Sequence, residues 1–449
     1  MSEKKLNRRQ FLKVASVVVA GAGLAACKAK VVTAPPQATK PPEATKPSAA
    51  PSATPPPAAP VTIKQWYHVY GEQGVEEAVN RYAKEYQAVK PNVTVEVGWM
   101  PDQTGSLQTA RAAGDAPDIY EDNNGIDQIK NGDVASLDGL LTPEEEADYP
   151  QSMIKRNRAY DGHLYALQNC IDTGTNTYRK SLFAEADITA APAILTDFTA
   201  AAKALTKGAM KGLFLGNDSG INDYYFIHLM WSTGIKSYLT EDNKPTFVTQ
   251  AVADVLTEFK KLATSDAMLI GAPADWWDPS AFNDGLCAMQ QNGLWAIPAI
   301  MKGPFADDWD CFPWPAAAAG VGTPSTFLGG HNQSVNPKSK ALEEAKAFLR
   351  WIWFENTEIQ EDFNLSYGFH IPPRISLAKK AKALQSGGPA KIVAALKYAQ
   401  IGGGVYWNGV MDQAINELMT DVCTKDVDPM EALKAAADKV NAEMPNLTK

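Results

Sequence analysis

The chain has 449 residues, of which 45% are hydrophobic and 21% charged, so it can bury a large core and is too long for one ordinary domain. The first 60 positions hold nine of the 42 basic and two of the 51 acidic residues, which leaves residues 61–449 with 33 basic and 49 acidic residues, a net charge of −16. Because phosphate binding needs a basic face, this acidic excess argues against nucleic acid as a partner and against electrostatic docking on anionic lipid.

A basic N-terminus precedes a short apolar run, Val14–Ala26. The run is too short to span a bilayer, which needs about 20 residues, and this arrangement is typical of an export signal. Asn7–Lys13 (NRRQFLK) resembles the twin-arginine signal, and Leu24–Cys27 (LAAC) resembles the bacterial lipobox, in which the cysteine is lipidated. We therefore predict an export signal over residues 1–27 with lipidation at Cys27, in preference to a buried N-terminal helix.

Residues 28–60 are predicted to form a disordered tether. Ten of the 27 residues from Ala34 to Pro60 are proline, and none is aromatic or a large aliphatic. Such a stretch cannot bury a core, and in polyproline II conformation, at about 3.1 Å per residue, it reaches roughly 80 Å. The tether then holds a folded domain, residues 61–449, clear of a membrane that the protein touches only through its lipid.

The folded domain opens with a predicted β-α-β unit. A strand at Val61–Gly71 is followed by a helix at Gly74–Pro91, whose apolar residues recur at helical spacing, and by the alternating strand Asn92–Trp99. A second helix (Thr104–Ala113) and a strand (Asp118–Tyr120) extend the unit. We expect parallel strands joined by right-handed crossovers.

The rest of the chain continues in α/β style. The stretch from His163 to Phe183 is predicted as strand, loop and strand, and Ala281–Ile300 as turn, strand, turn and strand. Apolar periodicity predicts helices at residues 196–207 (with Thr196 as the cap), 225–234, 249–265, 339–354 and 428–444. The fold class is therefore α/β.

Two loops of the first unit are candidate ligand-binding segments. Tyr67–Glu72 follows the first strand, and the carboxylate- and amide-rich stretch Glu121–Asn124 follows the third. In open α/β sheets, ligands bind beyond the carboxyl ends of the strands, so both loops meet at one edge. The alternative for Glu121–Asn124 is a surface turn that caps the following helix.

The chain shows no spacing that marks catalysis, a metal site or a cofactor site. No two of the five histidines are spaced as a paired-ligand helix, and no zinc, EF-hand, nucleophile-elbow or P-loop pattern occurs. The many acidic residues leave a glycosidase pair open but single none out. We expect no catalytic residues, no metal and no cofactor.

Four cysteines lie beyond the lipobox, namely Cys170, Cys287, Cys311 and Cys423. Their spacing contains no Cys-x-x-Cys motif and cannot assign a disulfide pairing. We expect free buried thiols, with one or two disulfides as the alternative.

Aromatic residues recur in polar, glycine-rich surroundings, at Trp66–Tyr67, Trp276–Trp277, Trp295, Trp314 and Tyr406–Trp407. An aromatic ring covers the apolar face of a sugar while nearby carboxylates and amides bind its hydroxyls. Core packing is the alternative for each tryptophan taken alone. Their recurrence at predicted loops favours a sugar-binding cleft.

Several motifs then resemble one family, the extracellular solute-binding proteins of ABC importers, in the carbohydrate-binding group that includes maltose-binding protein. These motifs are Ala113–Ile119 (AGDAPDI), Phe282–Trp295 (FNDGLCAMQQNGLW), Phe327–Gly330 (FLGG), Val335–Ser339 (VNPKS) and Phe348–Trp351 (FLRW). They lie in the family's order and span nearly all of residues 61–449.

The resemblance implies a type II periplasmic-binding-protein fold, with two α/β sandwich lobes joined by three crossing segments. These crossings are expected near Cys170, Trp295–Pro298 and Gly329–His331. The N-lobe is then about 61–169 with 297–329, and the C-lobe about 170–296 with 330–449.

Loop positions, aromatic pattern and resemblance together give the candidate ligand-binding residues Trp66, His68, Tyr70, Glu121, Asp122, Asn123, Asp172, Asn222, Asp223, Trp276, Trp277, Trp295, Gly330, His331 and Trp407. The resemblance implies a monomeric, lipid-anchored, extracytoplasmic receptor that captures a carbohydrate and delivers it to the permease of an ABC importer. The alternatives are a secreted carbohydrate-active enzyme and a binding protein for another small solute, such as a polyamine or glycerol phosphate. The acidic loop disfavours phosphate and permits cations.

Overall fold

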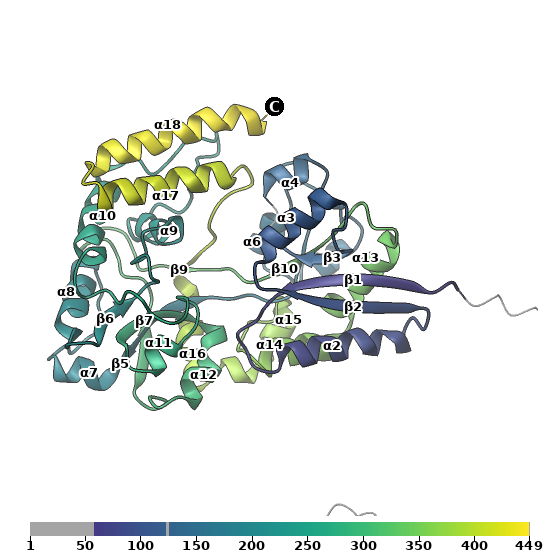
Figure 1. Cartoon of the computed structure of the whole chain (residues 1–449), viewed down its shortest axis with the longest axis horizontal. Coiled ribbons are helices and arrows are strands. Elements are labelled where there is room, and N and C mark those ends of the chain that lie inside the picture. Colours follow the sequence, from purple (N-terminus) through teal and green to yellow (C-terminus); the bar gives the residue numbers. More distant parts are fainter. Residues whose placement is uncertain (1–57, 123–124, 449) are drawn as a thin grey trace, which may run out of the picture. The chain divides into compact units, whose positions relative to one another are not determined.

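The computed structural model describes residues 58–122 and 125–448. The predicted export signal, the predicted lipidation site Cys27, residues 28–57 of the predicted tether and the candidate Asn123 lie outside these residues. Within them, two separate sheets are each packed with helices (Figure 1). A third, two-stranded sheet is formed by short strands next to the segments that join the two. In the part of the chain that is described, no helix has both the length and the apolar character that a membrane crossing requires.

The first lobe is built on a five-stranded sheet. Its strands, in spatial order, are β2 (Val93–Met100), β1 (Val61–His68), β3 (Ile119–Glu121), β10 (Asn332–Val335) and β4 (Leu167–Gln168). β1 runs parallel to β2 and β3, whereas β10 runs antiparallel to β3 and β4. The helices of this lobe are α2 (Val75–Glu85), α3 (Gln103–Ala113), α4 (Ile126–Lys130), α5 (Pro143–Glu146), α6 (Gln151–Asn157), α13 (Leu342–Arg350) and α14 (Thr357–Leu365).

Local sequence explains the β1–α2–β2 unit. The apolar positions of α2 fall on one face, so Val75, Val79 and Tyr82 are buried against the sheet. β1 alternates between buried and more exposed positions, with Tyr67 turned inward and His68 outward. These predictions are confirmed. The third strand is one residue later than predicted, so Glu121 is a buried strand residue and not a loop residue.

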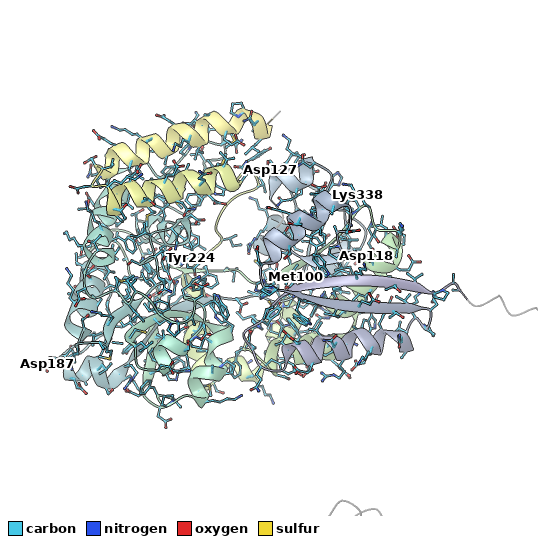
Figure 2. All side chains as sticks on the ribbon, in the orientation of Figure 1. Met100, Asp118, Asp127, Asp187, Tyr224 and Lys338 are labelled. Atoms are coloured by element: carbon cyan, nitrogen blue, oxygen red, sulfur yellow. The ribbon has the colours of Figure 1, made fainter. Side chains whose placement is uncertain are left out.

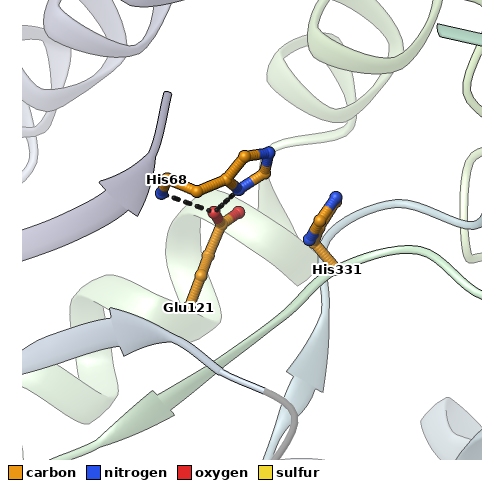
Figure 3. Close-up of side chains that lie close together, drawn as sticks. All are labelled: His68, Glu121 and His331. Atoms are coloured by element: carbon orange, nitrogen blue, oxygen red, sulfur yellow. Dashed lines mark hydrogen bonds and ion pairs between the residues drawn. The ribbon is translucent and has the colours of Figure 1, made fainter. Parts of the chain in front are cut away.

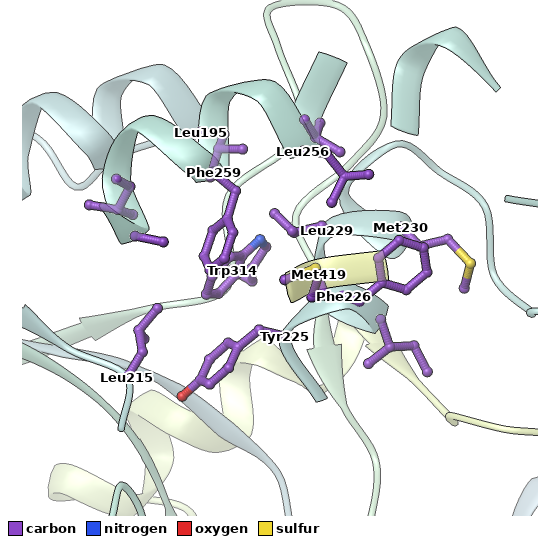
Figure 4. Packing of buried hydrophobic residues seen from close by; sticks show 14 of the residues in the cluster. Leu195, Leu215, Tyr225, Phe226, Leu229, Met230, Leu256, Phe259, Trp314 and Met419 are labelled. Carbon is purple, nitrogen blue, oxygen red and sulfur yellow. The ribbon is translucent and has the colours of Figure 1, made fainter. Parts of the chain in front are cut away.

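The second lobe is built on a four-stranded sheet in the order β6 (Lys211–Phe214), β7 (Cys287–Gly293), β5 (Gly174–Arg179) and β8 (Trp309–Phe312). Its helices are α7 (Lys180–Glu185), α8 (Leu195–Leu205), α9 (Asp223–Ser232), α10 (Gln250–Ala263), α11 (Ser280–Asn283), α12 (Ile297–Lys302), α16 (Gly387–Val393), α17 (Gly409–Thr424) and α18 (Pro429–Thr448). α17 and α18 lie side by side, the yellow pair in Figure 1. A core of large apolar side chains, with Trp314, Phe259 and Tyr225 among them, fills this lobe (Figure 4).

The chain passes between the lobes three times, as the fold class predicts. The first passage joins β4 to β5, and the second joins β9 (Thr326–Phe327) to β10. The third follows α14 and includes α15 (Ile375–Ala378), and after it β11 (Ala399–Gln400) pairs with β9. Backbone bridges between Ile171 and Ile371 and between Asp172 and Gly329 tie the three passages together.

The predicted division of the lobes is wrong for residues 297–329 and for the part of residues 330–449 that precedes the third passage, whereas α16, α17 and α18 lie in the second lobe as expected. We expected residues 297–329 in the N-lobe and residues 330–449 in the C-lobe. Instead, β8 pairs with β5 in the second sheet, and β10 pairs with β3 and β4 in the first. The hydrogen-bonding neighbour of a strand decides to which sheet it belongs, and periodicity along the chain carries no information about that neighbour.

Two local predictions also differ from the structure. Thr196 does not cap α8, because the helix already begins at Leu195 and the cap position is Ile194. Trp295–Pro298 is not a crossing, because the chain turns there through a short 3-10 segment into α12. Pro298 lies in the first turn of that helix, where its missing N–H costs no hydrogen bond.

Candidate functional site

The carboxyl ends of β1 and β3 bring His68 and Glu121 together. The strands are parallel neighbours, with Trp66 in register with Tyr120, so their last residues reach the same edge of the sheet. His68 Nδ1 lies 2.7 Å from Glu121 Oε2, and the backbone N–H of His68 donates to the same oxygen at 3.3 Å (Figure 3). The carboxyl ends of these two strands therefore do meet at one edge, as predicted.

Glu121 is buried and fully hydrogen-bonded. Its second oxygen, Oε1, accepts hydrogen bonds from the hydroxyl of Tyr70 at 2.6 Å and from Asn169 Nδ2 at 2.8 Å. Its exposed fraction is 1%. Burial by itself disfavours the charged form, but His68, and beyond it His331, lower the pKa of this carboxyl below its ordinary value. The carboxylate is thus ionised and fixed in one position.

His331 completes this group of three side chains. Its ring centroid lies 4.2 Å from that of His68, with the planes 32° apart. Burial, together with neighbouring His68, lowers the pKa of His331 to about 4, so its ring is neutral at physiological pH. Gly330 before it has φ 107°, and a Cβ there would lie 2.2 Å from the carbonyl oxygen of Cys170. Glycine at position 330 therefore allows the first and second passages to approach each other closely.

Asp172 belongs to a second buried cluster at the junction of the lobes. His370 Nδ1 lies 2.8 Å from Asp172 Oδ1, and His370 Nε2 lies 2.8 Å from Glu72 Oε1. Burial by itself lowers the pKa of His370, but the two carboxylates raise it well above its ordinary value. His370 is therefore an imidazolium that joins the loop after β1 to two interlobe passages.

A cavity of about 740 Å³ lies beside Glu121 and takes its lining from both lobes. The first lobe contributes Gln108, Arg111, Glu121, Asp122, Gly125, Asp127, Gln128, Asn131, Asp133, His331 and Asn332, and the second contributes Trp407, Asn408, Gly409 and Asp412. Asp127, on the side of α4 that faces α17 (Figure 2), accepts a hydrogen bond from Asn408 Nδ2 at 3.2 Å. Asp122 lies 3.5 Å from Arg111. Carboxylates and amides thus dominate the lining.

Trp407 lines this cavity but is also a core residue. Its exposed fraction is 8%, and it belongs to the apolar core of the second lobe. Its Nε1 donates to Asp412 Oδ1 at 2.6 Å. Most of the indole is therefore packed in the core, and its stacking on a sugar stays a prediction.

The other candidate tryptophans form a separate aromatic cluster in the second lobe. Trp276 stacks on Tyr224 with centroids 5.0 Å apart, and Trp295 meets it edge to face at 6.1 Å. Trp295 Nε1 donates to the backbone oxygen of Trp277, a residue that is 40% exposed. A Cβ on Gly71, in the loop after β1, would lie 3.0 Å from the Trp277 ring, so the cluster reaches the first lobe.

The remaining candidates have structural contacts of their own. Asn222 caps α9 by accepting from the backbone N–H of Tyr225, and the backbone N–H of Asp223 donates to Asn416. Trp66 lies on β1 against Gly98, where a Cβ would meet its ring at 2.8 Å. None of these three lines the cavity of about 740 Å³.

Sequence reasoning missed several residues at the site. Asn169, Glu72 and His370 complete the two buried clusters, and Asp127 and Asp412 face the cavity. Glu72 lay in the predicted loop Tyr67–Glu72 and Asp127 close to the predicted loop Glu121–Asn124, but neither was singled out. The others come from distant parts of the chain, and no local pattern distinguishes them from ordinary polar residues.

Comparison with known proteins agrees with this architecture. In a search of solved structures, the GacH receptor of Streptomyces glaucescens, studied unliganded and with acarbose, matches with a TM-score of 0.73 and 23% identity over 87% of this chain and 100% of that one. An ABC substrate-binding protein of Listeria monocytogenes in complex with cycloalternan matches with a TM-score of 0.72 and 21% identity over 86% of this chain and 99% of that one. These likenesses confirm the predicted two-lobed fold.

Sequence comparison gives the family. A multiple sugar-binding protein of Streptococcus mutans is 21% identical over 297 residues, which are 62% of this chain and 68% of the relative. The model of the bacterial extracellular solute-binding proteins matches residues 72–352, more than half of the chain. The protein therefore belongs to the family of bacterial extracellular solute-binding proteins.

Proposed function

We propose that this protein captures a carbohydrate between its lobes and delivers it to the permease of an ABC importer. The observation that carries the proposal is the cavity of about 740 Å³ lined from both lobes by carboxylates and amides. Such groups bind sugar hydroxyls with charge-assisted hydrogen bonds. The sugar ligands named for the related proteins support the same class of solute.

The proposal includes a location for the protein. The lipobox at Leu24–Cys27 and the proline-rich tether after it support an exported monomer that is anchored to the outer side of the cell membrane through a lipid on Cys27. The net charge of −16 over residues 61–449 supports this, because it disfavours binding to lipid phosphate and to nucleic acid. The protein acts as a receptor and not as an enzyme.

Calorimetric titration of the purified chain with a panel of sugars tests the proposal. The panel contains acarbose, cycloalternan, maltose, mannobiose and tagatose, with spermidine and glycerol 3-phosphate as other solutes. A sugar at 100 times its Kd should stabilise the fold by about 2.7 kcal/mol. Asp127→Asn, on the cavity wall, should weaken sugar binding at least about tenfold, since hydrogen bonds to charged groups contribute roughly 1.5–3 kcal/mol.

Asp187→Asn is the matched control. Asp187 lies at the outer edge of the second lobe (Figure 2), and asparagine tolerates its φ of 55°. This variant should bind the sugar like the wild type. Binding of spermidine without binding of any sugar would show that the solute is a cation and not a carbohydrate. New reducing ends after incubation with oligosaccharides would show that the protein is an enzyme.

A further inference from the structure

Three potential metal ligands from distant parts of the chain converge at the edge of the first sheet. One ligand atom each from His68, Glu121 and His331 lies within 4.8 Å of the other two. Figure 3 shows the two imidazole rings and the carboxylate gathered where β1 and β3 end and where the second passage enters β10. No pairwise spacing in the sequence indicates this group.

The donor set has the chemistry of a transition-metal site. Two imidazoles and one carboxylate are ligands that Zn²⁺, Co²⁺ and Ni²⁺ accept, and three protein ligands leave one coordination position open. Zinc–ligand distances of about 2.0–2.2 Å place neighbouring ligand atoms of a tetrahedral site roughly 3.2–3.5 Å apart. Small side-chain adjustments from the present separations reach that geometry. Glu121 and His331 also line the cavity, so the open position has access from it.

Hydrogen bonds from neighbouring residues fix the orientation of the Glu121 carboxylate. Tyr70 and Asn169 donate to Oε1 of Glu121, which leaves Oε2 facing His68. Hydrogen bonds of this kind orient the first ligands of protein metal sites. His68 Nδ1 and Glu121 Oε2, 2.7 Å apart, are the two ligand atoms between which the cation would bind.

The local balance of charge also favours a cation. Three buried carboxylates lie close together here, those of Glu72, Glu121 and Asp172. Within the described residues, the ion pairs recorded for these three are all with histidine, and His370 alone is shared by two of them. A divalent ion beside Glu121 would add positive charge next to these carboxylates.

The neighbouring group of Cys170, Asp172 and His370 is a weaker candidate. Its members are all buried, and both ring nitrogens of His370 already lie 2.8 Å from carboxylate oxygens. A metal there would have to displace Glu72 or Asp172 from His370. His68 and His331 are both less buried than His370.

We propose that His68, Glu121 and His331 form a binding site for one divalent transition-metal ion, with Zn²⁺ the best match to the donor set. The site is independent of the identity of the solute.

The test uses the full chain, purified without a polyhistidine tag, stripped with EDTA and titrated with Zn²⁺ by calorimetry. We expect one tight equivalent. Co²⁺ in its place should give the intense visible absorption of a four-coordinate site. His331→Gln and His68→Gln should each weaken Zn²⁺ binding by about 100-fold or more, because the loss of even an outer partner costs about 10–100-fold.

Two variants serve as controls. His163→Gln removes an exposed histidine that pairs with Asp138 away from the site, and should bind Zn²⁺ like the wild type. Cys170→Ser tests the neighbouring group and should also leave Zn²⁺ affinity unchanged. Absence of tight Zn²⁺ binding to the wild type, equal affinity in all variants, or loss only in Cys170→Ser would each overturn the proposal.

A measurement on the wild type does not depend on whether the variants fold. The ring protons of His68 and His331 should shift or broaden in NMR spectra as Co²⁺ is added, while those of His163 stay unchanged. Sugar binding is read out separately, so a failure of the metal site leaves the proposed solute capture standing.

Discussion

The ring of Trp407 lies face to face with that of Tyr238, with centroids 4.1 Å apart and planes 13° from parallel. The contact holds the start of α17 against the core of the second lobe while the indole N–H anchors Asp412 on the cavity wall. A residue that the sequence placed on a cleft wall thus also has the packing of a core residue.

Trp407→Ala should therefore lower the free energy of unfolding by about 3–5 kcal/mol, as expected for a truncated core tryptophan. Trp407→Phe keeps an aromatic ring on Tyr238 and loses the hydrogen bond to Asp412, so it should cost less. Urea unfolding of both variants measures this. If Trp407→Ala left the free energy of unfolding nearly unchanged but greatly lowered sugar affinity, Trp407 would be a sugar-stacking residue and not a core residue.

Replacing His370 should lower the stability of the protein, because it removes the cation of the buried cluster between the lobes. His370→Gln leaves Glu72 and Asp172 without their cation, and breaking a buried ion pair from one side costs about 3–5 kcal/mol. The exposed pair of His163 with Asp138 offers the control, since solvent screens it and His163→Gln should change little. Equal stabilities of the two variants would contradict a charged His370.

The same cluster predicts how wild-type stability depends on pH. The pKa of His370 is raised above its ordinary value of 6.5, so its contribution is complete below pH 6.5 and is lost as the pH rises through the folded-state pKa. The pKa of Asp172 is lowered from 3.8, so its contribution is lost as the pH falls through that lower value. Thermal unfolding measured upward from pH 6.5 should show a decline in the wild type that is smaller in His370→Gln.

The four cysteines of the described chain should be free and unreactive. Cys170, Cys287 and Cys423 are buried and Cys311 is partly buried, and none forms a disulfide, as we predicted. Burial raises the pKa of Cys311 and of Cys423 to about 11, and raises those of the other two. In a Cys27→Ala background, a thiol reagent should react slowly with the native protein and reach four equivalents after unfolding. Two missing equivalents would show a disulfide.

Cys27→Ala should also release the protein from membranes or block its maturation, because the lipid is the proposed anchor. Fractionation of cells into membrane and soluble parts, followed by immunoblotting, measures the change. Cys311→Ala, at a thiol within the fold, is the control and should stay with the membrane. If the Cys27→Ala protein fractionated like the wild type, the proposed lipid anchor at Cys27 would be wrong.

Solute binding should bring the two lobes together, because the cavity is lined from both and a ligand favours the state in which it makes the most contacts. Small-angle scattering should show a smaller radius of gyration once a sugar from the panel is saturating. Asp127→Asn at the same sugar concentration should show less of this change. An unchanged radius for the saturated wild type would contradict closure.

Much of the local structure follows from the sequence. The spacing of Val75, Val79 and Tyr82 predicts α2, and alternation predicts β2, because each reflects a backbone repeat of a few residues. The AGDAPDI and FLGG motifs indicate the family and hence the two-lobed fold. The meeting of the carboxyl ends of β1 and β3 follows from the parallel sheet alone.

The tertiary structure decided what those repeats cannot encode. β10 joined the first sheet and β8 the second, against expectation, because long-range packing selects the neighbour of a strand. His331 reached His68 and Glu121, and His370 reached Asp172, across stretches with no shared pattern. Periodicity reports only which face of an element is buried, whereas a site depends on which distant side chains then occupy the same few ångströms.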